Sequence, residues 1–110
     1  MYVYDEANNL AKAIKESKEY LEYKKIKEEV ESDTEMKKKI EDFEKLRYEV
    51  QVKVVEGGNQ DEEKTKKLQE MYQILLNDSK LKEYFDIEVR FNIMLADVNK
   101  IIGESVQDLL

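Results

Sequence analysis

The sequence predicts an all-α fold, an antiparallel bundle of about five helices, and three observations support this prediction. The 110 residues contain no proline, which would interrupt helices, and only three glycines. Charged residues, mostly the helix formers Glu and Lys, make up 41% of the chain. Apolar residues recur at intervals of three or four, which places them on one face of a helix. We therefore expect a single helical domain spanning residues 1–110.

The first two helices are expected at about 5–16 and 18–31. Ser17 lies between them and is predicted to cap the second helix, because its hydroxyl can accept a hydrogen bond from a free amide of the next turn. Ser32 and Asp33 give the same signal before the third helix. The apolar stripes of these two helices consist of Ala7, Leu10, Ala11 and Ile14, and of Tyr20, Tyr23, Ile26 and Val30.

The third helix is expected at about 34–56 and is one of two long helices. Gly57 and Gly58 follow it, and glycine readily adopts the left-handed conformation that ends a helix. Residues 48–54 alternate between apolar and polar, which is typical of a strand. Their only candidate partner is the short segment 2–4, and an isolated two-stranded hairpin is marginal in water. The prediction is therefore a helix.

The fourth helix is expected from its N-cap, Asp61, to about Leu76, with a clean amphipathic pattern. The second long helix follows at about 79–102. Gly103 is expected to end that helix, and the apolar residues beyond it are expected to dock as a short tail. These tail residues are Val106, Leu109 and Leu110.

The fifth helix carries apolar residues on two faces. A surface helix needs only one buried face, so we expect this helix to lie between two partners, either inside the monomer or across a dimer. The main stripe consists of Tyr84, Ile87, Phe91, Met94, Leu95, Val98, Ile101 and Ile102, and the second strip of Phe85, Val89, Ile93 and Ala96. We predict a homodimer whose helix–helix or dimer interface consists of Ile40, Phe43, Val50, Tyr84, Ile87, Phe91, Met94, Val98 and Ile101.

The composition excludes several kinds of chemistry. The chain has no cysteine, so it can supply neither a disulfide nor a thiolate for catalysis, zinc or an iron–sulfur cluster. It also has no histidine, the commonest general base. We predict no catalytic residue, no metal and no cofactor. The formal charge is −7, and no predicted segment has more basic than acidic residues, which argues against direct nucleic-acid binding.

No apolar run approaches the roughly 20 residues of a membrane span, and the N-terminus lacks the features of a signal peptide. We therefore expect no membrane partner and a cytoplasmic location. Carboxylate pairs at helical spacing could hold magnesium if two of them faced one cleft, but a solvated charged face is the simpler interpretation. These pairs are Glu19/Glu22, Glu28/Glu31, Glu41/Glu44 and Glu83/Asp86. An Arg47–Glu88 ion pair between the two long helices is a further hypothesis.

Four features together resemble a known family. In segment 13–20, a Ser-x-x-Tyr motif lies at the junction between the first and second predicted helices, and Asp33 lies at the next junction. Phe43 with Leu46 and the segment 97–102 complete the pattern. It resembles the YlbF/YmcA-like (Com_YlbF) family of small bacterial helical proteins, and is most similar to the uncharacterised YheA-type members. The resemblance covers nearly the whole chain.

This resemblance implies an all-helical, dimer-forming cytoplasmic protein of Gram-positive bacteria. Relatives act as non-enzymatic regulators of competence, sporulation and biofilm formation, through a complex that influences RNA processing. Some relatives carry cysteines linked to iron–sulfur clusters, a cofactor that does not carry over to a chain without cysteine. We therefore expect a non-enzymatic regulatory adaptor that binds other cytoplasmic proteins. The alternatives are a carboxylate-dependent magnesium hydrolase of the all-α type and a purely structural helical assembly protein.

Overall fold

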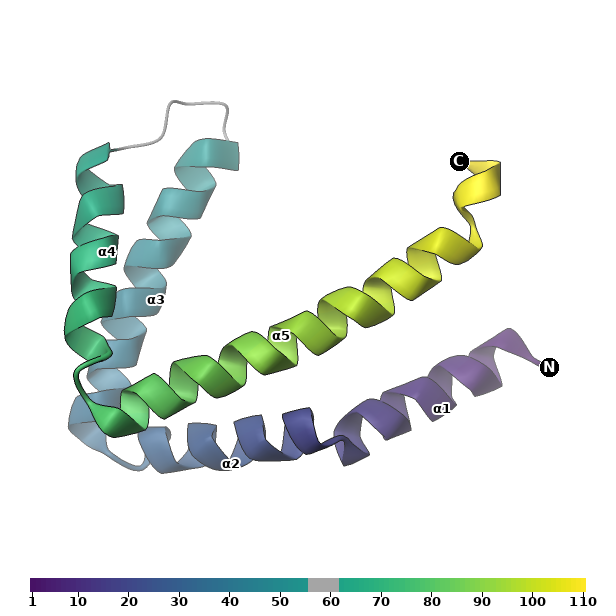
Figure 1. Ribbon diagram of the computed structural model, residues 1–110, viewed down its shortest axis with the longest axis horizontal. Helices are drawn as coiled ribbons and strands as arrows, with labels where there is room; N and C mark the ends of the chain where they lie inside the picture. Colours follow the sequence, from purple (N-terminus) through teal and green to yellow (C-terminus); the bar gives the residue numbers. More distant parts are fainter. Residues whose placement is uncertain (56–61) are drawn as a thin grey trace. The chain divides into compact units, whose positions relative to one another are not determined.

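The computed structural model describes residues 1–55 and 62–110, with residues 53–55 described by their backbone only (Figure 1). These ranges form five α-helices and one short 3₁₀ helix, and they contain no strand. The all-α prediction is confirmed, including helix rather than strand for the described part of residues 48–54. The elements are α1 (Val3–Glu16), α2 (Lys18–Glu31), α3 (Thr34–Val55), α4 (Glu62–Leu75), α5 (Ser79–Ser105) and η1 (Gln107–Leu109).

Short polar side chains set the boundaries between these helices. The Ser17 hydroxyl donates a hydrogen bond to the Ile14 carbonyl oxygen at 2.6 Å and accepts one from the Tyr20 amide at 3.1 Å. This hydroxyl therefore bonds to both the end of α1 and the start of α2, and the predicted cap of the second helix is confirmed. Asp33 caps α3 in the same way, because its Oδ1 accepts hydrogen bonds from the amides of Glu35 and Met36 at 3.0 and 3.1 Å.

The end of α5 differs from the prediction. Gly103 does not end the helix, which continues to Ser105. An isolated glycine costs a helix only about 1 kcal/mol relative to alanine, and the flanking residues outweigh this cost. The expected docking of the tail is also wrong, since Val106, Leu109 and Leu110 are all exposed. The predicted glycine stop after α3 and the Asp61 cap of α4 lie outside the described residues.

The chain divides into two compact units, which are described separately. Unit 1 consists of Met1–Lys27 and Tyr84–Leu110, and unit 2 of Glu28–Glu83. Unit 1 thus holds α1, most of α2 and most of α5, while unit 2 holds α3 and α4 with the adjoining helix ends. A single domain over residues 1–110 remains a prediction.

In unit 2, α3 and α4 pack side by side and run in opposite directions (Figure 1). The Phe43 and Tyr72 rings stack across this helix pair, with centroids 5.7 Å apart. An ion pair of 3.6 Å between Lys64 and Glu49 joins the same two helices at their surface. The buried apolar residues of this unit are Val30, Ile40, Phe43, Leu75 and Leu81.

In unit 1, an aromatic cluster joins α2 to the N-terminal half of α5. The Tyr23 ring lies 5.1 Å from the Phe91 ring and 5.9 Å from the Tyr84 ring, measured between centroids. The Tyr23 hydroxyl also donates a hydrogen bond of 3.3 Å to the buried Glu88 carboxylate. Tyr20 adds a further ring contact with Phe91 at 6.4 Å. The main stripe of α5 is therefore covered where it meets α2.

Candidate interaction surface

Most of the nine residues predicted to form a helix–helix or dimer interface are shielded within the chain. Ile101 alone among them is exposed, with 68% of its surface accessible. Contact of any of the nine with a second copy therefore remains a prediction. The buried ones are Ile40, Phe43, Tyr84 and Ile87, and the partly buried ones are Val50, Phe91, Met94 and Val98.

A different set of apolar residues is exposed, and it is concentrated in unit 1. Among the described residues, the exposed large hydrophobic side chains of unit 2 are only Tyr48 and Ile74. All the others belong to unit 1, and we call them the exposed apolar surface. It consists of Met1, Tyr2, Val3, Tyr4, Leu10, Leu21, Val89, Ile93, Ile101, Ile102, Val106, Leu109 and Leu110.

Helix α1 contributes Val3, Tyr4 and Leu10 to this surface. It has no buried residue, although its sequence has a clear apolar stripe. Only Ile14 of this stripe is partly buried. The stripe was visible in the sequence, but no local signal indicates whether the folded chain covers it. The nine residues of the predicted interface therefore include none from α1.

The second strip of α5 divides into a covered and an uncovered part. Phe85 is buried, whereas Val89 and Ile93 are about half exposed. Phe85 therefore meets a partner inside the chain, and a partner for Val89 and Ile93 remains a prediction. The helix remains available to an outside partner at Val89 and Ile93.

A groove of about 360 Å³ lies beside Ile93, between α2 and α5 of unit 1. Ile93 and Met94 are its apolar lining residues, and its other lining residues are charged side chains of both signs. One apolar side chain of a partner would fit a groove of this size, with polar contacts at its rim. The charged residues that line it are Lys18, Glu19, Glu22 and Arg90.

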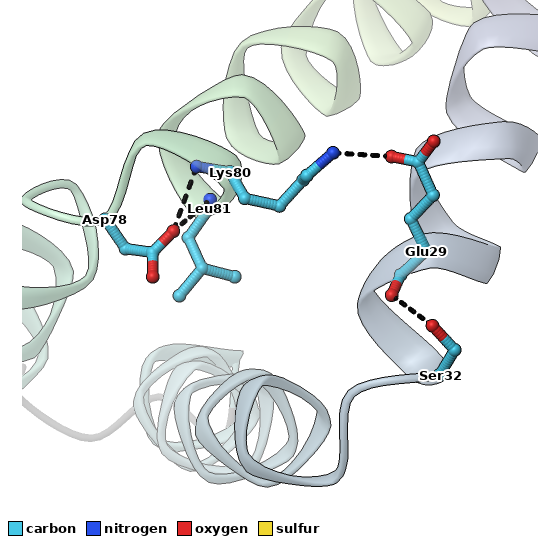
Figure 2. Close-up of polar contacts among 5 residues, drawn as sticks. All are labelled: Glu29, Ser32, Asp78, Lys80 and Leu81. Atoms are coloured by element: carbon cyan, nitrogen blue, oxygen red, sulfur yellow. Dashed lines mark hydrogen bonds and ion pairs between the residues drawn. The ribbon is translucent and has the colours of Figure 1, made fainter.

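In unit 2, an ion pair links the end of α2 to the start of α5, and a carboxylate caps α5. Figure 2 shows the Lys80 ammonium donating a hydrogen bond of 2.7 Å to the Glu29 carboxylate, which links the start of α5 to the end of α2. This hydrogen bond and the negative charge of Glu29 raise the pKa of Lys80 above its ordinary value of 10.5. Beside it, Asp78 Oδ1 accepts hydrogen bonds from the amides of Lys80 and Leu81 and so caps α5.

The acidic residues do not gather into a metal site in the parts of the chain that the structure describes. Within residues 1–55 and 62–110, no group of three or more acidic side chains lies close enough to hold an ion. Arg47 forms an ion pair with Glu44 of its own helix. The Arg47–Glu88 pair remains a prediction, because Arg47 belongs to unit 2 and Glu88 to unit 1. Among the described helices, none combines the length and hydrophobicity that crossing a membrane requires.

Comparison with solved structures agrees with this fold. A DUF964 protein of unknown function from Bacillus stearothermophilus superposes with a TM-score of 0.83, at 19% identity, over 97% of this chain and 94% of that one. Bacillus subtilis RicA, solved in complex with RicF, provides a second match with a TM-score of 0.61 at 23% identity. That match covers 96% of this chain and 94% of the other. Both comparisons support the helical architecture.

Comparison of sequences identifies the family. A UPF0342 protein of Symbiobacterium thermophilum is 36% identical over 104 residues, which cover 94% of this chain and 93% of that protein. A UPF0342 protein of Caldicellulosiruptor saccharolyticus is 38% identical over 104 residues, covering 94% and 87%. Residues 3–107 match the family described as control of competence regulator ComK, YlbF/YmcA. The chain therefore belongs to the YlbF/YmcA family of bacterial proteins.

Proposed function

We propose that this protein is a non-enzymatic regulatory adaptor of the bacterial cytoplasm, which works as a homodimer and binds other proteins through unit 1. Its output would lie in the control of competence, sporulation or biofilm formation, as the family resemblance implies. The observation that carries this proposal is the concentration of exposed apolar side chains in unit 1. Large exposed apolar patches on soluble proteins typically mark sites of protein interaction.

The surroundings of Ile93 support a protein partner in particular. The groove beside it is lined by apolar Ile93 and Met94 together with charged residues such as Lys18, Glu22 and Arg90. This arrangement is common in interfaces between proteins that also exist separately. Lys18 and Glu22 already form a long ion pair of 3.8 Å, in which the Lys18 side chain is 79% exposed and can reorient toward a partner.

The relatives support the same proposal. The family description refers to control of a competence regulator, which is a regulatory role and not a catalytic one. The RicA structure contains a second protein, RicF, so a chain of related fold can bind another protein. By analogy, the partner of the present chain would be a protein and not a small substrate.

The test is affinity capture of the full-length chain from a lysate of the bacterium that encodes it. We expect the wild type to retain a small set of defined proteins in near-stoichiometric amounts. The Ile93→Asp variant should lose them, because it places a charge on the apolar floor beside the groove. The matched control is Ile74→Asp, which makes the same change at an exposed isoleucine of unit 2 and should retain them.

Two results would contradict the adaptor proposal. One is a wild type that enriches no protein above the matrix control. The other is an Ile93→Asp variant that retains the same proteins in the same amounts as the wild type. Purified candidate proteins should then be tested by direct titration, so that a bound protein is identified and its affinity measured for all three chains.

A further inference from the structure

We propose that Ser17 is a hinge at which the segment 3–31 exchanges between two separate helices and one continuous helix. In the structure α1 and α2 are separate, and Ser17 is the single residue between them. Its backbone is extended, with φ −69° and ψ 151°. This inference goes beyond the proposed function, because it concerns the direction of α1 and does not depend on the identity of any partner.

The first argument concerns the cause of the break between the two helices. No glycine or proline lies in the junction, and the Lys and Glu residues on both sides of it are good helix formers. The Ser17 hydroxyl instead bonds to the Ile14 carbonyl oxygen and to the Tyr20 amide, and so competes with the backbone hydrogen bonds of a helix. In a continuous helix, the Tyr20 amide would donate to the Glu16 carbonyl oxygen. Both forms therefore satisfy this amide, through different acceptors.

The second argument concerns the balance between the two forms, which differ by only a few hydrogen bonds. The two-helix form has the Ser17 cap. A continuous helix would add backbone bonds from the amides of Lys18 and Glu19, which belong to the first turn of α2 and have no acceptor within that helix. A serine cap and an accessible backbone hydrogen bond contribute similar free energies. Neither form therefore has a large advantage, and the less stable one is populated as a minor state.

The third argument is that packing fixes α2 but not α1. The rings of Tyr20 and Tyr23 contact Phe91 of α5, with centroids 6.4 and 5.1 Å apart. By contrast, α1 has no buried residue, and only Ile14 of its apolar stripe is partly buried. Figure 1 shows that α1 leaves the line of α2 at the junction. A change in the direction of α1 about Ser17 therefore breaks few contacts within the chain.

The position of Leu21 indicates what the continuous form changes. Leu21 is 54% exposed and lies off the stripe that α2 packs against α5. The apolar stripe of α1, at positions 3, 7, 10 and 14, has heptad spacing, and positions 17 and 21 continue it. In a continuous helix, Leu21 would therefore share a face with this stripe, whereas the extended Ser17 interrupts the alignment in the two-helix form. The hinge thus controls whether one apolar face extends from α1 into α2.

The experiment compares the full-length wild type with Ser17→Ala by nuclear magnetic resonance. Alanine removes the capping hydroxyl and is the best helix former. We expect the Cα chemical shift of residue 17 to move from an extended to a helical value. Hydrogen exchange of the Lys18 and Glu19 amides should slow more than about tenfold, because they gain carbonyl partners. Ser17→Asp keeps a capping side chain and should resemble the wild type.

The matched control is Asp33→Ala at the next junction, which removes the cap of α3. The helix segments on both sides of that junction have buried residues, Val30 before it and Ile40 after it. Packing should therefore keep α2 and α3 separate in this variant. Exchange of the Glu35 and Met36 amides, which lose their acceptor, should become faster instead of slower.

Relaxation dispersion on the wild type tests the exchange itself, on the microsecond-to-millisecond timescale. We expect residues 17–19 to exchange with a minor state whose chemical-shift differences match those between the wild type and Ser17→Ala. A wild type without this exchange overturns the proposal, and so does a Ser17→Ala chain in which residue 17 stays extended. Either result leaves the adaptor proposal standing, because capture of partner proteins is a separate measurement.

Discussion

Units 1 and 2 differ in how completely they bury their apolar side chains. Unit 2 packs two helices against each other, stacks Phe43 on Tyr72 and leaves only Tyr48 and Ile74 exposed among its described large apolar residues. Unit 1 buries apolar residues where α2 meets α5, but α1 has no buried residue, and Ile101 and Ile102 near the end of α5 are exposed. Unit 2 therefore supplies its own core, whereas we expect a partner to cover the exposed apolar residues of unit 1.

The largest expected effect is that of Phe91→Asp, which removes the centre of the unit 1 cluster and places a charge there. Truncation of a fully buried aromatic residue costs about 3–5 kcal/mol, so we expect a smaller cost at the partly buried Phe91, to which an unpaired charge in an apolar environment adds. We expect a lower melting temperature by circular dichroism and loss of the dimer by light scattering. An unchanged melting curve with an unchanged mass would mean that Phe91 belongs neither to a core nor to an interface.

Leu81→Ala tests the core of unit 2. Leu81 is fully buried, so we expect the free energy of unfolding to fall by about 2–5 kcal/mol in a urea titration. The comparison variant is Ile101→Ala in unit 1, which should change the unfolding of diluted monomer by less than about 1 kcal/mol. If both substitutions lowered the free energy of unfolding of the monomer equally, Leu81 and Ile101 could not belong to a covered and an uncovered stripe, respectively.

The helix caps should have smaller and similar effects in the two units. Ser17→Ala removes the cap of α2, and Asp78→Ala removes the cap of α5. Each substitution should destabilise the chain by about 1 kcal/mol, measured by thermal unfolding. Because capping is a local interaction, this cost should not depend on protein concentration. A concentration-dependent loss for Ser17→Ala would instead link that position to the dimer contact.

The smallest effect is expected from the Lys80–Glu29 ion pair of unit 2. The raised pKa of Lys80 means that the ammonium is stabilised in the folded state, so its contribution is complete below the unfolded value of about 10.5. It is lost as the pH rises through the raised folded value. Thermal unfolding of the wild type and of Lys80→Met should therefore differ slightly at neutral pH and converge at strongly alkaline pH. A difference that grows with pH would contradict this assignment.

The positions of the helix boundaries illustrate what local chemistry can determine. Ser17, Asp33 and Asp78 cap the helices that follow them, and each interaction spans no more than three residues. The caps at Ser17 and Asp33 were predicted from the sequence for this reason, whereas the cap at Asp78 was not. Gly103 is the exception, because its unfavourable propensity is small compared with the preference of its neighbours for helix.

The candidate site could be predicted only in part. The stripes on α1 and α5 were visible as spacing, but Ile87 and Ile101, which lie two heptads apart and occupy equivalent positions of one stripe, differ from buried to 68% exposed. Spacing shows which residues share a face and contains no information about what lies opposite that face. The predicted interface therefore included residues such as Phe43 and Ile87, which packing within the chain already buries.

By itself, the sequence determined the helical fold class, the order of the helices and most of their ends, since propensity, periodicity and capping act over a few residues. It also determined the absence of thiol and imidazole chemistry. The tertiary structure alone decided which apolar faces are covered, because burial depends on contacts between segments far apart in the chain. That decision places the uncovered apolar surface on unit 1, and with it the site at which we expect the protein to meet its partners.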